Sequence, residues 1–167
     1  MLDLSCDIAP ETRAFVARVD APIGRWAVCV RAVVCAPEDI STIGDWADIV
    51  NMGRSTLCGR CRAVHASVKD SLAFGRLARA VTLDDPLHWR PENVLDVVDP
   101  RTMRSLLGKG GLTSFCGRER PTLRVLYDSH RFRLPAAGLT LLAAMLNREC
   151  RAWRPGQRLF SRGMTPR

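Results

Sequence analysis

The side chains best suited to chemistry are two closely spaced thiols, Cys58 and Cys61. Together with His65, four residues further on, they offer three of the four ligands that a structural zinc site needs. No fourth ligand follows at metal-site spacing, and the two cysteines fall three apart on one predicted helix with Cys61 turned inward. We therefore expect these thiols to pack rather than to bind metal, and we predict neither a metal site nor a cofactor.

The sequence also lacks a recognisable catalytic arrangement. Its three histidines, His65, His88 and His130, do not stand in a pattern with a nucleophile or a carboxylate. The glycine-rich stretch that begins at Gly108 follows a predicted helix, whereas phosphate-binding loops follow strands. We therefore predict that this protein is not an enzyme.

The stretch around Cys58 and Cys61 is more informative for its basic side chains, which have no carboxylates near them in the sequence. Residues 49–69 contain no acidic residue. A helix through this stretch would carry a positive face, which suits the phosphates and base edges of the DNA major groove. The residues expected to approach DNA are Arg54, Ser55, Cys58, Gly59, Arg60, Arg62 and Lys69.

Three predicted helices would position this face. Residues 43–50 form a short helix after the start signals Ser41 and Thr42, and the turn residues 51–53 close it. A second helix then spans 54–64, with Leu57, Cys61 and Val64 as its buried stripe. A longer third helix continues to Val81. The order helix, tight turn, helix is that of a helix-turn-helix.

The spacing resembles the first helix-turn-helix of the AraC/XylS transcriptional regulators. The residues that carry the resemblance are Ala47, Leu57, Arg60, Ser67, Arg76, Leu77 and Ala80, and the sequence departs from the family pattern at Gly53, Cys61, His65 and Val68. The resemblance covers about 40 residues and implies a DNA-binding helix-turn-helix followed by a linker helix. It implies that Arg60 and the outer side of the second helix approach DNA, with Ala47, Leu57, Leu77 and Ala80 in the core.

A second region, 82–118, echoes these intervals. Asp99 and Pro100 start a helix that Gly110 and Gly111 end. The residues that repeat the earlier intervals of Gly53, Leu57, Cys61, His65 and Ser67 are Asp99, Met103, Leu107, Gly111 and Thr113. We expect either a degenerate second helix-turn-helix whose Arg101 and Arg104 contact phosphate, or a unit that only packs.

The flanking regions are expected to support this centre. Residues 1–40 carry two helical patterns that would brace the helix-turn-helix, and residues 119–167 contain an apolar helix over 139–146 and a basic C-terminal arm. Residues 123–127 are too short to separate strand from helix. The last region, 113–167, holds 11 arginines against three acidic residues, so most of the excess charge lies there.

Composition agrees with a basic all-α helical bundle that has one core. The 167 residues carry a net charge of +8, and the pI is near 9.7. We expect double-stranded DNA as the partner, no membrane association and a cytoplasmic location. A homodimer is the oligomer to test, although no heptad seam is visible. The alternative is a helical protein-interaction module with a basic surface and no DNA readout.

Overall fold

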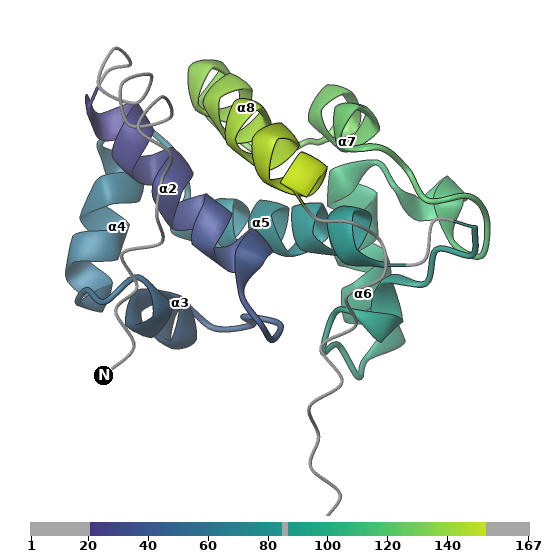
Figure 1. Cartoon of the computed structure of the whole chain (residues 1–167). Coiled ribbons are helices and arrows are strands. Elements are labelled where there is room, and N and C mark those ends of the chain that lie inside the picture. The colour runs from purple at the N-terminus through teal and green to yellow at the C-terminus, as the bar shows by residue number, and fades with distance from the viewer. Residues whose placement is uncertain (1–20, 85–86, 153–167) are drawn as a thin grey trace, which may run out of the picture.

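A computed structural model describes residues 21–84 and 87–152, with side chains up to residue 147. The described residues form seven α-helices and two short 3-10 turns, and they contain no strand. The predicted all-α fold is therefore confirmed. The long helix α5 (Val68–Leu83) crosses the molecule, with α3 and α4 on one side of it and α6 and α7 on the other (Figure 1).

The helix-turn-helix region folds within two residues of the predicted boundaries. Helix α3 spans Ile43–Ile49, α4 spans Arg54–Arg62, and α5 follows. The Thr42 hydroxyl accepts a hydrogen bond from the Asp45 amide at 3.1 Å, and Ser67 caps α5 in the same way through Asp70. The turn between α3 and α4 contains Asn51 in the left-handed region, at φ 49°. Local sequence signals therefore fix this part of the fold.

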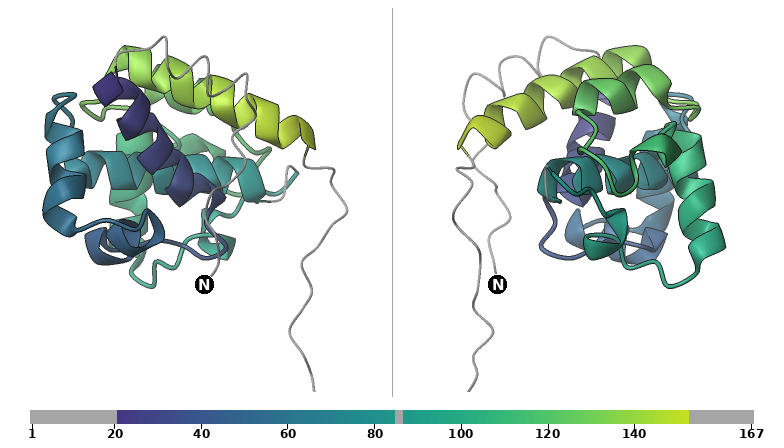
Figure 2. Two further views of the ribbon diagram at one scale, coloured as in Figure 1. Left: turned by 60° about the vertical axis from the view of Figure 1, so that its left-hand side comes forward. Right: turned by 90° about the vertical axis from the view of Figure 1, so that its right-hand side faces the viewer.

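The core forms where α2 (Ala21–Cys35) packs against α5 and α8 (Ala136–Ala152). Figure 2 shows α8 lying across α2 and α5 in two further views. Three fully buried tryptophans fill the interior, and each indole N–H has an acceptor. Trp26 donates to Ser71 Oγ at 2.9 Å, Trp46 to the Cys29 carbonyl at 2.8 Å, and Trp89 to the Ala80 carbonyl at 3.3 Å. These bonds fix the rings and tie α2, α3 and α5 together.

The second region forms only part of the expected unit. Helix α6 spans Pro100–Gly110, as predicted, and Asp99 caps it by accepting from the amides of Arg101 and Thr102 at 3.1 Å each. These bonds and the hydroxyl of Thr102, the largest cause, lower the pKa of Asp99. Before α6, however, residues 87–99 contain only the 3-10 turn η1 (Pro91–Asn93). The expected second helix-turn-helix over 82–118 therefore lacks its first helix.

The remaining described elements close the bundle. The 3-10 turn η2 (Thr113–Phe115) follows α6, and residues 123–129 form helix α7 (Leu123–Ser129), which settles the ambiguity between strand and helix. Helix α8 starts before the predicted apolar stretch 139–146 and contains it. The first of the two helical patterns predicted in residues 1–40 and the basic arm after residue 152 lie outside the described residues.

Candidate nucleic-acid interface

Helix α4 turns one side to the core and one side to solvent. Leu57 and Cys61 are buried at 0% and 1% exposure, as predicted from their spacing. Four of the predicted DNA contacts on this helix are exposed, namely Arg54, Ser55, Gly59 and Arg62, and Lys69 at the start of α5 is exposed as well. We call Arg54, Ser55, Gly59 and Arg62 the outer face of α4. Cys58 lies at its edge and is half-buried.

Arg60 does not belong to the outer face. Its side chain is half-buried, and its Nη1 donates to the Cys29 Sγ of α2 at 3.5 Å. The expectation that Arg60 points outward is therefore wrong. The sequence held the signal, because Leu57, Arg60, Cys61 and Val64 follow the i, i+3, i+4, i+7 spacing of a single helix face. The charge of Arg60 favours the solvent side of the helix, but its spacing from Leu57 favours the inner side.

The thiols around Arg60 are suited to packing. Burial raises the pKa of Cys29, against the opposing effect of Arg60, and burial raises the pKa of Cys61 to about 11. Both are therefore protonated at neutral pH, and a protonated thiol is neither a good metal ligand nor a good nucleophile. No group of three candidate metal ligands is found in the part of the chain that the structure describes.

Arg54 lies against the preceding helix of the unit. A Cβ atom built on Gly44, in the first turn of α3, would overlap Arg54 Nη2. The absence of a side chain at Gly44 thus makes room for the guanidinium at the start of α4. This contact gives Arg54 a defined position beside the helix-turn-helix turn while the side chain as a whole remains exposed.

The turn after α4 holds a histidine in a backbone conformation that favours glycine. His65 has φ 56°, in the left-handed region, and the Ala66 amide donates to the Cys61 carbonyl at 2.9 Å. This is the Schellman geometry that normally takes glycine, the residue that the family has here. A non-glycine residue adopts this conformation at a cost of roughly 1–2 kcal/mol.

Helix α6 repeats the backbone geometry of α4 at the predicted intervals. Gly53 and Asp99 are both N-caps with extended backbone. At the other end Gly111, at φ 70°, takes the place of His65, and the Leu112 amide donates to the Leu107 carbonyl at 2.9 Å. The position of Arg60 is taken in α6 by Leu106, which is buried. The two helices therefore follow one pattern.

Charged residues on α6 are exposed, and α6 lies toward the other end of α5 from α4 (Figure 1). Arg101 and Arg104 are exposed, as predicted, and no acidic residue lies within α6 itself. Lys109 Nζ lies 3.9 Å from Asp70 Oδ1 at the start of α5. The lysine is exposed and the two atoms are far apart for an ion pair, so the contact contributes little to stability.

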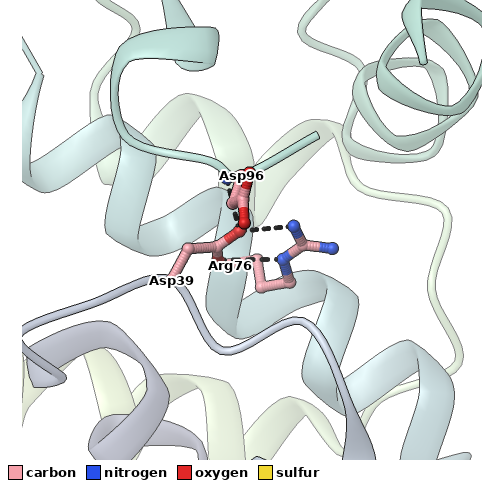
Figure 3. Close-up of polar contacts among 3 residues, drawn as sticks. All are labelled: Asp39, Arg76 and Asp96. Atoms are coloured by element: carbon pink, nitrogen blue, oxygen red, sulfur yellow. Dashed lines mark hydrogen bonds and ion pairs between the residues drawn. The ribbon is translucent and has the colours of Figure 1, made fainter. Parts of the chain in front are cut away.

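A buried ion pair links the two regions, and sequence reasoning missed it. Arg76 of α5 donates through Nε to Asp39 Oδ1 at 3.0 Å, and its Nη2 contacts Oδ2 at 2.5 Å (Figure 3). Asp39 Oδ2 also accepts from the Asp96 amide at 2.7 Å. The side chain of Asp39 is only 3% exposed. One carboxylate therefore joins the loop before α3, the helix α5 and the segment before α6.

Comparisons with known proteins identify no relative. No protein family, no curated protein and no solved structure matches this chain. Within the described residues, no helix has the length and apolar character needed to cross a membrane.

Proposed function

We propose that this protein is a sequence-specific DNA-binding transcriptional regulator that places α4 in the major groove. The observation that carries the proposal is the outer face of α4, which is exposed, free of carboxylates and backed by two buried residues of the same helix. A nine-residue helix is about 14 Å long, comparable with the roughly 12 Å width of the groove.

The parts of this face would have different roles. Arg54 and Arg62 carry the positive charge that neutralises phosphates and can donate two parallel hydrogen bonds to guanine. Ser55 offers a hydroxyl to a base edge or phosphate. Gly59 has no atom within 4 Å of a built Cβ, so neighbouring protein groups do not require a glycine there. A glycine at this position would let the helix backbone come close to a ligand.

Titration of random-sequence duplex DNA at two salt concentrations tests the proposal. Each phosphate contact adds about −0.9 to the slope of log K against log salt, so affinity should fall steeply as salt rises. Selection from a randomised duplex pool should then enrich a defined site. Absence of binding at both salt concentrations would contradict the proposal and favour a helical protein-interaction module.

A further inference from the structure

The most exposed large apolar side chain among the described residues, Val98, lies beside α6. A groove of about 900 Å³ runs between η1, α6 and η2, and its apolar lining includes Val97, Val98, Met103 and Leu107. Val98 stands at its edge with 93% of its surface exposed. Val98 and the apolar lining together leave apolar area in water that a partner could bury.

The repeated geometry of α4 and α6 accounts for this groove. In the first region α3 packs on α4, and Leu57 is fully buried. In the second region η1 replaces the corresponding helix, and Met103, at the position of Leu57, is 9% exposed and lines the groove. The groove therefore lies in the region where the second unit lacks a covering helix.

The groove carries one charge of each sign. Glu92 and Arg104 both line it, both are exposed, and neither has an ion pair to another described residue. A surface that carries one acid, one base and a protruding apolar residue beside an apolar hollow is complementary to itself. A two-fold axis would oppose Glu92 of one copy to Arg104 of the other.

We propose that this groove is a self-association surface whose occupant is a second copy of this chain. Val98 of each copy packs against the Met103 and Leu107 floor of the other, and the two Glu92–Arg104 pairs set the register. The contact is small, so the dimer is weak and depends on protein concentration. The inference does not depend on the proposed function, because association is measured without DNA.

Sedimentation of the full-length protein over a wide concentration range tests the surface. The wild type should shift from monomer to dimer as its concentration rises. Val98→Asp should weaken association by at least about tenfold, because a carboxylate would enter an apolar hollow. Leu87→Asp is the matched control, since Leu87 is 71% exposed but does not line the groove. A monomeric wild type, or equal association of both variants, overturns the proposal.

Charge reversal gives a second test that does not rely on Val98. Glu92→Arg and Arg104→Glu should each weaken self-association, because each opposes like charges across the axis. The double variant E92R/R104E should restore association, and so should mixing the two single variants, because both contacts across the axis then join opposite charges. Circular dichroism checks that every variant is folded. Single variants that associate as the wild type does, or a double variant that fails to recover, would overturn the pairing.

Discussion

Helices α4 and α6 begin and end alike, yet they are covered differently. Each follows an extended N-cap, buries residues at the same two intervals and ends in a left-handed residue, His65 or Gly111. Helix α4 packs against α3, whereas only a 3-10 turn precedes α6. The same helical pattern can therefore support an exposed polar face in one place and border an open apolar groove in the other.

The C-terminal ends of α4 and α6 are held by different residues. At the end of α4 a histidine occupies a left-handed position with its side chain exposed. At the end of α6 the corresponding glycine has no room for a side chain, because a built Cβ would lie 2.7 Å from Ser129 Cβ and 2.9 Å from the Ser129 carbonyl oxygen. The end of α6 is therefore fixed by tertiary packing, and the end of α4 mainly by local hydrogen bonds.

The largest expected effect is on the link between the regions. Asp39→Asn should lower the free energy of unfolding by about 3 kcal/mol, because it leaves the Arg76 guanidinium without its buried counter-charge. Chemical denaturation measures the loss. The control is Asp128→Asn, which breaks the exposed Arg124 pair and should change stability by less than about 0.5 kcal/mol. Equal effects of the two variants would show that the Asp39 pair does not hold the regions together.

The next largest loss of stability is expected from a substitution at the end of α6. Gly111→Ala should destabilise the protein by about 2–3 kcal/mol, the sum of left-handed strain and overlap with Ser129. Gly117→Ala is the matched control, because Gly117 has φ 71° but open space around its Cβ position. It should cost only about 1 kcal/mol in thermal or chemical unfolding. A Gly111 variant no less stable than the Gly117 variant would contradict the packing argument.

Gly59→Ala separates stability from binding on α4. The substitution should raise the free energy of unfolding by about 0.5–1 kcal/mol, because glycine is a poor residue within an exposed helix. If Gly59 approaches DNA closely, the same variant should bind DNA less tightly. Gly108→Ala is the matched change in α6, also with open space, and should stabilise without weakening DNA binding. Undiminished DNA affinity in the Gly59 variant would remove that residue from the interface.

His65→Gly should have the smallest effect on stability, and this effect should be stabilising. Glycine relieves left-handed strain at φ 56° but adds chain entropy to the unfolded state, so the net stabilisation is expected to be below about 1 kcal/mol. Thermal unfolding of His65→Gly and His65→Ala tests this prediction. Alanine keeps the left-handed strain at this position, whereas glycine relieves it. A glycine variant no more stable than the alanine variant would show that the strain is absent.

Features set by neighbouring residues could be predicted from the sequence, and features set by distant ones could not. Caps, turn residues and apolar spacing located α3, α4, α5 and α6 within two residues. The missing helix before α6 was not predicted, because the repeated intervals of 99–113 concern α6 and the turn after it. Helix α7 stayed ambiguous because a short apolar run fits both helix and strand.

The errors at the candidate interface have separate causes. Arg60 was misplaced although its spacing from Leu57 indicated an inward position. The pairing of Asp39 with Arg76 could not be predicted, because the partners are 37 residues apart and meet only through tertiary packing. Exposure of Arg54, Ser55, Gly59 and Arg62 followed from helical spacing, and their contact with DNA remains a prediction.

The most direct measurement of the central claim is the salt dependence of duplex binding in two double variants. R54A/R62A removes two cations from the outer face of α4, and R124A/R133A removes two exposed cations on and after α7, a helix that lies toward the other end of α5 from α4 (Figure 1). The account predicts that the slope of log K against log salt becomes shallower by about 1 to 2 in R54A/R62A and is unchanged in R124A/R133A. Equal slopes in the two variants would contradict docking through α4.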